Sequence, residues 1–477
     1  MKRRTFLELG AAAPLVPLLG CGGGGSPTNP TDNPGTVPTG AELAELQRLA
    51  NAGGNPRVFE ATLNAAQGQT QFIPGVNTQV WSYNGATPGP LIDVFEGDTV
   101  RITFNNNLAQ DSTIHWHGVP VPPSQDGLPM DPIPPGAARV YQFPIPRGAA
   151  GTFWYHPHPH VNSAEQLFRG LAGMFIIRAG QDPLGVFEQK NLFITDLRLD
   201  AQGQIPASTD QDRIGGREGN HLLVNGHEFP RITIRPGTIQ RWRIVNATTS
   251  RFLRLALQNH SLVQVGSDGG LLQAPITRGE IFLSPAERAE VLVVANQGPG
   301  ASAQLVALPY DPQRIGAPGP SPQVAVATLA YTMDPPVATP RIPSSLRQIN
   351  RYGTPNVRRA VLFQFNGSNQ FLVNGKVFDP NRVDIRSSVG QLEEWEVTNL
   401  AGMDHPFHIH QGQFQIVNRT RGGVTTGEPL AWKDTFNMAP GEIVRFRMTF
   451  PRKGLNVFHC HIVEHEAHGM MGVHEIR

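Results

Sequence analysis

The sequence predicts an all-β protein built from three similar domains in series, and three observations point to this fold class. The 477 residues include 51 Gly and 43 Pro but only 16% charged residues, a mix typical of many short strands joined by turns. Asn-Gly pairs that end at Gly85, Gly226 and Gly375 lie between apolar runs, where Asn-Gly is a strong hairpin signal. A similar strand that ends in Asn follows each pair, and repetition at this spacing indicates whole domains rather than a short-repeat solenoid.

The first 40 residues predict an export signal followed by a linker. Lys2-Arg3-Arg4-Thr5-Phe6-Leu7 resembles a twin-arginine signal, and the apolar run after it is too short to span a bilayer of about 30 Å. Leu18-Leu19-Gly20-Cys21 resembles a lipobox, which would place a lipid anchor on Cys21. A plain cleaved signal that discards Cys21 is the alternative. We therefore expect an exported protein, either periplasmic or anchored to the membrane at the cell surface.

Three β-domains are expected after this segment, at residues 41–182, 183–338 and 339–477. Their limits fall near Gly180–Lys190 and within the Pro-rich stretch Asp334–Arg351. Residues 41–50, which open the first domain, read as a short helix. The stretch Asp311–Pro322 is rich in Pro and Gly and reads as a loop.

Charge and cysteine content limit the partners and the cross-links. The formal net charge of +1 gives no case for a nucleic-acid partner or for an acidic membrane surface. There are only two cysteines, Cys21 and Cys460, and neither can form a disulfide while it serves as a lipid attachment point or as a metal ligand, so we expect no disulfide. We also expect a monomer.

The residues with the clearest chemistry lie near the C-terminus. Cys460, His465 and Met470 offer a thiolate, an imidazole and a thioether. Together with one more His, these are the ligands of a blue-copper electron-transfer site in which Met is the weak axial ligand. His459 and His461 flank the Cys, and on a strand they would point away from it, toward a different site. The stretch therefore predicts two metal sites joined through one Cys.

Four His-x-His pairs define the second site. They are His115/His117, His156/His158, His408/His410 and His459/His461. Residues i and i+2 of a strand share a face and lie roughly 6.6–7 Å apart, so each pair can reach one metal ion or two adjacent ions. Imidazole suits copper, zinc and iron alike, and the neighbouring blue-copper ligands favour copper. The His outside the pattern are expected to be exposed or hydrogen-bonded: His160, His221, His227, His260, His468 and His474.

The four motifs, their order and the threefold repeat resemble the multicopper oxidases, a family that includes laccases, bilirubin oxidases and bacterial cuprous oxidases. The resemblance covers roughly residues 56–477. It implies three cupredoxin-like domains of Greek-key β-barrel or sandwich form that hold four copper ions. The middle domain has no His-x-His where its repeat would place one, at Gln258–Ser261, so it looks like a spacer and wall. The copper cluster would lie between the first and third domains.

The resemblance also implies the role of each ligand. A type 1 copper would be held by His405, Cys460, His465 and Met470, and a type 2 copper by His115 and His408. A type 3 pair would be held by the other six members of the pairs: His117, His156, His158, His410, His459 and His461. Electrons from the substrate would pass from Cys460 through the backbone to its two neighbouring His, and four such transfers would reduce O₂ to two waters.

Two acids match the family's proton carriers. Glu466 adjoins His465, and Asp126 lies in Gln125-Asp126-Gly127. Carboxylates are among the usual groups that deliver protons to a buried site. Plainer readings stay open at this point: Asp126 as a turn residue before Gly, and Glu466 as a solvated acid.

The implied activity is that of a copper-dependent oxidoreductase with O₂ as acceptor, and two substrate classes are candidates. A Met axial ligand implies a lower type 1 potential, which favours easily oxidised phenols and aromatic amines, so a laccase-like oxidase is our first hypothesis. Oxidation of Cu(I) or another metal ion is the alternative, because Met403 resembles a Met at the substrate site of some cuprous oxidases. Against it, Ala401 stands where those enzymes carry an acid, the chain has only nine Met and no Met-rich insert, and Met403 also reads as a core residue. A non-enzymatic copper-binding protein is a third hypothesis, which the filled ligand positions disfavour.

Overall fold

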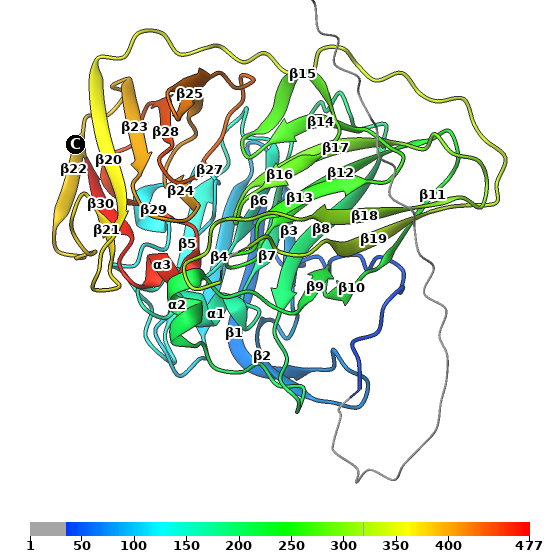
Figure 1. Cartoon of the computed structure of the whole chain (residues 1–477), viewed down its shortest axis with the longest axis horizontal. Helices are drawn as coiled ribbons and strands as arrows, with labels where there is room; N and C mark the ends of the chain where they lie inside the picture. Colours follow the sequence, from blue (N-terminus) through cyan, green and yellow to red (C-terminus); the bar gives the residue numbers. More distant parts are fainter. Residues whose placement is uncertain (1–34, 318) are drawn as a thin grey trace, which may run out of the picture. The chain divides into compact units, whose positions relative to one another are not determined.

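The computed structural model describes residues 35–317 and 319–477, which are drawn in colour in Figure 1. The chain divides into two units, Met1–Asn33 and Pro34–Arg477, and the fold below is that of the second unit. The predicted twin-arginine signal and Cys21 lie outside the described residues. Export, lipid attachment and the monomeric state therefore stay predictions. None of the described helices is long and apolar enough to cross a membrane.

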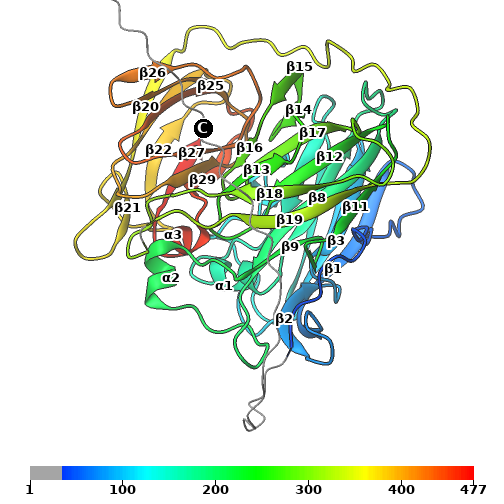
Figure 2. The same ribbon diagram turned by 45° about the vertical axis from the view of Figure 1, so that its right-hand side comes forward.

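Strands dominate the described residues, which confirms the predicted all-β class. They form six sheets, and each strand pairs only with strands of its own third of the chain, so each third contributes two sheets. Figures 1 and 2 show the strands of each third grouped together, from blue to cyan, in green, and from yellow to red.

The first domain contains β1 to β7. One sheet has the order β2-β1-β4-β5 (Thr78–Tyr83, Val58–Thr70, Thr99–Asn106, Ala138–Pro144), and the other has the order β3-β7-β6 (Gly89–Phe95, Gly173–Arg178, Gly151–Tyr155). Along β4, the buried Val100, Ile102 and Phe104 alternate with half-buried residues, so one face of this strand enters the core. The 3-10 turn η1 (Pro123–Gln125) and helix α1 (Ser163–Phe168) lie in the connections.

The middle domain contains β8 to β19. One sheet has the order β10-β9-β8-β12-β17-β14-β15 (His227–Glu228, His221–Val224, Glu188–Leu197, Ile239–Asn246, Arg288–Val294, Leu262–Ser267, Gly270–Arg278). The other has the order β11-β19-β18-β13-β16 (Arg231–Ile234, Val324–Tyr331, Ser302–Leu308, Leu253–Leu257, Ile281–Leu283). β12 is buried along its whole length, so its charged residues need partners. Arg241 and Arg243 pair with Glu290 of β17, which also accepts a hydrogen bond from Thr152 of the first domain. Helix α2 (Asp210–Gly215) lies between β8 and β9 in sequence.

The third domain contains β20 to β30. One sheet has the order β21-β20-β23-β28-β25-β26 (Phe371–Val373, Val357–Phe365, Glu393–Asn399, Ile443–Met448, Gln415–Arg421, Val424–Thr426). The other has the order β22-β30-β29-β24-β27 (Val383–Ser387, Met471–Ile476, Gly454–Cys460, His405–Ile409, Thr435–Met438). Helix α3 (Val463–Ala467) follows β29. The neighbouring strands β29 and β24 of the second sheet carry four of the eight predicted ligands of this domain: His405, His408, His459 and Cys460.

The Asn-Gly turns have the same geometry in each domain. Asn84, Asn225 and Asn374 have φ of 53°, 52° and 51°, and the glycines after them have φ of 76°, 85° and 74°. Two successive positive φ angles are what a type I′ hairpin turn requires, and Gly adopts them at no steric cost. Each Asn accepts, through Oδ1, a backbone N–H from the first strand of its domain, at Asn64, Phe193 and Leu362. That first strand pairs in parallel with a later strand, β1 with β4, β8 with β12, and β20 with β23.

The Asn that ends the repeated strand also has one role in every domain. Nδ2 of Asn106, Asn246 and Asn399 donates to two backbone carbonyls at 2.8–3.0 Å. One carbonyl belongs to the loop that follows (Gln110, Arg251, Met403), and the other belongs to a segment further along the chain (Ile133, Leu283, Met438). The Asn side chain thus holds the loop in place through backbone carbonyl acceptors alone. In the first and third domains this loop leads into His115 and His405. The repeated Asn thus helps to position the candidate site.

Residues 41–50 are extended rather than helical, so that prediction was wrong. Their backbone bonds to two edge strands: the Leu43 N–H donates to Arg231 O of β11, and the Leu49 N–H donates to Leu91 O of β3, each at 2.8 Å. An isolated helix of this length is marginal in water, whereas an edge strand offers unpaired backbone groups that an extended segment can satisfy.

Three short helices from the three domains meet beside the third domain (Figures 1 and 2). Helix α3 contacts both α1 and α2. The stretch Asp311–Pro322, which is irregular in its described residues as predicted, lies against α2, where the Arg314 guanidinium donates to Gly215 O. Because α3 carries His465 and Glu466, elements of all three domains surround these two side chains.

Candidate metal centre

Antiparallel pairing of β24 and β29 sorts the C-terminal ligands onto two faces. His408 lies opposite His459, and Phe407 lies opposite Cys460. Opposite residues share a face and successive residues alternate faces, so His459 and Cys460 point to opposite sides of the sheet. The sheet therefore separates two groups of ligands that are adjacent in sequence.

One group contains His405, Cys460 and His465. The Nδ1 atoms of His405 and His465 lie 3.3 and 3.8 Å from Cys460 Sγ and 3.2 Å from each other. All three side chains are fully buried. Met470 is buried in the same core cluster as Cys460, and its carbonyl accepts the Cys460 N–H at 3.0 Å. The structure thus brings together three of the four predicted type 1 ligands and packs the fourth residue beside them.

On the other face, three imidazoles from two domains converge. His158 Nε2 and His410 Nε2 lie 3.1 and 3.2 Å from His459 Nε2. Nitrogens about 2.0 Å from one ion in a tetrahedral arrangement lie about 3.3 Å apart, so these three atoms have the spacing of ligands that share an ion.

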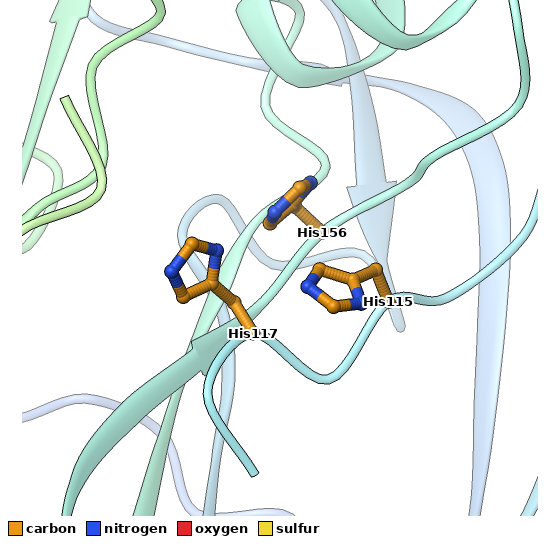
Figure 3. Close-up of side chains that lie close together, drawn as sticks. All are labelled: His115, His117 and His156. Atoms are coloured by element: carbon orange, nitrogen blue, oxygen red, sulfur yellow. The ribbon is translucent and has the colours of Figure 1, made fainter. Parts of the chain in front are cut away.

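The other five His of this face complete a second cluster. Figure 3 shows His115, His117 and His156 around a common space. His461 adjoins them, with ring centroids 5.0 Å from His117 and 5.4 Å from His156. The His117 ring also stacks on His408 at 3.9 Å. Residues of the first and third domains interleave, so the cluster lies between these domains, as predicted.

Ring nitrogens without hydrogen-bond partners indicate that these clusters bind metal. Among the predicted ligands, such buried nitrogens occur in His115, His117, His156, His158, His405, His408 and His461. An unsatisfied buried polar group costs roughly 1–3 kcal/mol, so a run of them calls for a ligand. Burial lowers the pKa of His405 and of His459 to about 3. Burial also lowers the pKa of His117, His156, His158, His408, His410, His461 and His465. These imidazoles are therefore neutral and keep a lone pair for a metal ion.

Asp126 bridges two of the His residues. Its Oδ1 lies 3.1 Å from His115 Nδ1, and its Oδ2 lies 2.9 Å from His410 Nδ1. Burial raises the pKa of the Asp126 carboxyl, and the neighbouring His115 opposes this change. Asp126 does precede a left-handed glycine, Gly127 (φ 64°), so it is a turn residue whose side chain also enters the site.

Glu466 is buried rather than solvated. Ser163 Oγ donates to Glu466 Oε1 at 2.9 Å, and the two carboxylate oxygens lie 3.7 Å from His158 Nδ1 and 3.6 Å from His459 Nδ1. Burial raises the pKa of Glu466 to about 8, with a further contribution from Glu464. This carboxyl can therefore hold a proton near neutral pH beside the His cluster.

A cavity of about 310 Å³ also reaches the cluster of eight His. Its lining includes His115, His408, His410 and Asp126. Small polar molecules can thus approach the cluster without crossing the Cys460 face.

The outer edge of His465 is covered. His465 Nε2 lies 3.1 Å from the carbonyl oxygen of Ile214 in α2, and the Phe371 ring stacks on the imidazole at 3.9 Å. His465 has no exposed surface. A reductant from solvent therefore meets α2 before it meets this imidazole.

Two residues close to the His cluster escaped the sequence reasoning. Asp434 forms a group with His117 and His408, and Arg288 of the middle domain pairs with Asp434. Neither residue belongs to a His-x-His motif. The only sequence signal is a charged residue beside a buried strand, at the start of β17 for Arg288 and just before β27 for Asp434.

The other His residues lie outside the ligand groups of the described chain. His260 Nε2 lies 2.6 Å from Tyr331 Oη, and His474 Nε2 lies 2.8 Å from Ser387 Oγ, which fits the plain reading. Met403 is fully buried in the core of the third domain, so its reading as a core residue is favoured.

Comparisons with known proteins agree with this geometry. Models of the multicopper oxidase family match residues 64–182, 194–331 and 353–477. A multicopper oxidase of Staphylococcus haemolyticus is 32% identical over 446 residues, 90% of each chain. The solved structure of a Campylobacter jejuni multicopper oxidase, described as a metallo-oxidase, is 39% identical with a TM-score of 0.87 and covers 92% of this chain and 96% of its own. A laccase structure from Pediococcus acidilactici is 32% identical with a TM-score of 0.81, and the match covers 93% and 95% of the two chains.

Proposed function

Because the chain belongs to the multicopper oxidase family, we propose that it uses four copper ions to couple one-electron oxidation of a small reducing substrate to the reduction of O₂ to water. The observation that carries this proposal is the pair of ligand groups on opposite faces of one sheet, both buried and adjacent at Cys460. A copper-binding protein without activity would need only one such group. Copper bound at the two ligand groups would supply the one-electron redox chemistry.

Each residue then has a defined task. His405, Cys460, His465 and Met470 would hold one ion, and the eight His of the other face would hold three. Peptide bonds join Cys460 directly to His459 and His461, so a single residue of backbone connects the two groups. This short covalent link is the route that we propose for electrons.

The two buried acids would manage protons. Glu466 lies beside His158 and His459, and its raised pKa keeps a proton available near neutral pH. Asp126 holds His115 and His410 from the cavity side, where O₂ and water would pass. Reduction of O₂ to water consumes one proton per electron, so a carboxyl on each side of the cluster fits the demand.

Copper loading tests the proposal directly. The protein purified with copper is expected to hold four ions per chain, to absorb in the visible range as blue thiolate–copper sites do, and to consume one O₂ for every four electrons taken from a phenol. Metal analysis, absorption spectroscopy and an oxygen electrode measure these quantities. Loss of all three on chelation and their return with copper support the proposal. A copper-loaded protein without the blue band would contradict it.

Small phenols and aromatic amines remain the first substrate class that we propose. The cover over His465 disfavours bulky aromatic donors, because their rings cannot contact this imidazole. The same cover leaves metal-ion oxidation as a second candidate, which the description of the Campylobacter jejuni relative also favours. Burial of Met403 counts against a substrate copper site at that residue.

Loosening α2 is expected to widen the range of aromatic substrates. The Arg314 guanidinium donates to Gly215 O and pairs with Glu218. These two contacts hold the end of α2 over His465. Arg314→Ala should raise kcat/KM for a bulky phenol about fivefold relative to a small one, because a lost hydrogen bond is worth about 1 kcal/mol. Steady-state oxidation of a graded phenol series and of Cu(I) measures this.

Arg213→Ala is the matched control for this change. Arg213 lies in the same helix, but its one ion pair within the described part of the chain is with the exposed Asp210. Equal changes in the two variants, or the same change for Cu(I) as for bulky phenols, would show that α2 does not select by size.

A further inference from the structure

A buried ion pair links the middle domain to the His cluster. Asp434 lies just before β27 of the third domain, and Arg288 opens β17 of the middle domain; both are fully buried. Arg288 Nη1 and Nη2 each donate to one carboxylate oxygen of Asp434 at 2.6 Å. Such two-point pairing fixes the orientation of a carboxylate as well as its position.

Asp434 in turn contacts one His of the first domain and one His of its own domain. Its Oδ1 lies 3.1 Å from His117 Nε2, and its backbone carbonyl lies 2.9 Å from His408 Nδ1. Both oxygens can only accept, so each imidazole donates an N–H to Asp434. The unpartnered nitrogens are then His117 Nδ1 and His408 Nε2. The Thr435 hydroxyl lies 3.3 and 3.1 Å from the same two nitrogens and itself donates to Asp434 Oδ1. Asp434, together with this hydroxyl, thus determines which nitrogen of each ring keeps the lone pair.

The Arg288 side chain has no freedom to adjust. A guanidinium has five N–H donors, and five acceptors surround this one. Besides the two oxygens of Asp434, they are the backbone carbonyls of Thr152, Ala286 and Asp268, at 2.9–3.1 Å. Thr152 belongs to the first domain, so Arg288 contacts all three domains.

The backbone beside His117 is fitted closely to this pair. Gly118 has φ of 79°, and a Cβ added there would lie 2.4 Å from Asp434 Oδ2 and 2.6 Å from Arg288 Nη2. Only Gly satisfies both the left-handed conformation and the close approach. The ion pair therefore packs directly on the chain that carries His117.

We propose that Asp434 and Arg288 are positioning residues that hold His117 and His408 in the tautomer and orientation required to bind copper. Asp434 acts on both imidazoles, and Arg288 fixes Asp434 from the middle domain. We assign Asp434 to positioning rather than to ligation, because its carboxylate already accepts N–H groups from Arg288 and from His117. The middle domain is therefore a structural part of the metal centre rather than a spacer. This inference rests on the proposed function in that it takes these His as copper ligands.

The test compares copper retention in Asp434→Asn, Arg288→Met and Arg288→Lys with that of the wild type. Outer partners of ligand His typically contribute 10- to 100-fold to metal affinity, so copper transfer to a chelator from the His cluster should be about 10- to 100-fold faster in the first two variants. The electron paramagnetic resonance signal of non-blue copper should change, while the blue absorption stays. Arg288→Lys keeps the charge but loses the two-point geometry, and should recover part of the retention.

Glu290→Gln is the matched control for stability. Glu290 lies two residues from Arg288 on β17, is equally buried and pairs with two arginines, but it contacts no His. It should lower the melting temperature of the copper-free protein as the test variants do, yet leave copper retention unchanged. If Asp434→Asn and Arg288→Met lose stability but retain copper and its spectrum, the inference is wrong. Absence of copper from the wild type would instead remove the proposed function.

Discussion

Replacement of Cys460 by Ser is expected to abolish the blue absorption and reduce turnover to background, while the His cluster still binds copper. Cys460 Sγ is the centre of its group, within 3.8 Å of the nearest nitrogens of His405 and His465. A serine hydroxyl does not ionise under these conditions and is a hard donor, so the thiolate–copper bond is lost. The backbone between residue 460 and its two His neighbours is unchanged. The copper ion that would pass electrons along this backbone is lost.

The change should not disturb the fold. Ser is close to Cys in size, and its hydroxyl can still accept the Ile462 N–H that now points at Sγ, 3.4 Å away. Metal analysis should find about one copper ion fewer per chain, and the non-blue copper signal should persist. Turnover at the wild-type rate in a colourless variant would refute the electron route through Cys460.

Glu466→Gln is expected to slow O₂ reduction by about 10²- to 10⁴-fold, the range of general acid catalysis, because Gln cannot release a proton. The amide can still bond to Ser163, so local packing is retained. Oxygen consumption at saturating reductant measures the loss. Bleaching of the blue band by reductant without O₂ should proceed at the normal rate, since that step needs no proton at the His cluster.

Glu464→Gln is the matched control for this prediction. Glu464 is as buried as Glu466, and burial also raises its pKa to about 8, yet it contacts no ligand His within hydrogen-bond distance. Its replacement should leave O₂ consumption within about twofold of wild type. Equal losses in the two variants would mean that buried charge in α3, rather than proton delivery by Glu466, supports turnover.

Local patterns in the sequence were enough to predict the fold class and the side chains that the structure gathers into the two candidate ligand groups. Asn84, Asn225 and Asn374 recur because each forms the same turn and bonds to the first strand of its own domain. Such local chemistry can be recognised from the sequence of each domain. The His-x-His pairs were equally readable, because strand alternation alone puts both rings on one face.

Features that depend on contacts between distant segments were not predictable. Arg288 and Asp434 are 146 residues apart, and no periodic pattern marks a pair that matters only through its position. The contact between the Ile214 carbonyl and His465 likewise joins residues that are 251 positions apart. The error at residues 41–50 has the same origin. Their composition favours a helix, but they bond to two edge strands that lie far away in the sequence.

The interleaving of the first and third domains also sets an order of events during synthesis. When only the first domain has emerged from the ribosome, its His115/His117 and His156/His158 pairs face no partners, and the Cys460 group does not yet exist. Neither centre is complete until β29 and α3, among the last segments made, have docked. The complete set of eight His therefore exists only after the third domain has folded against the first.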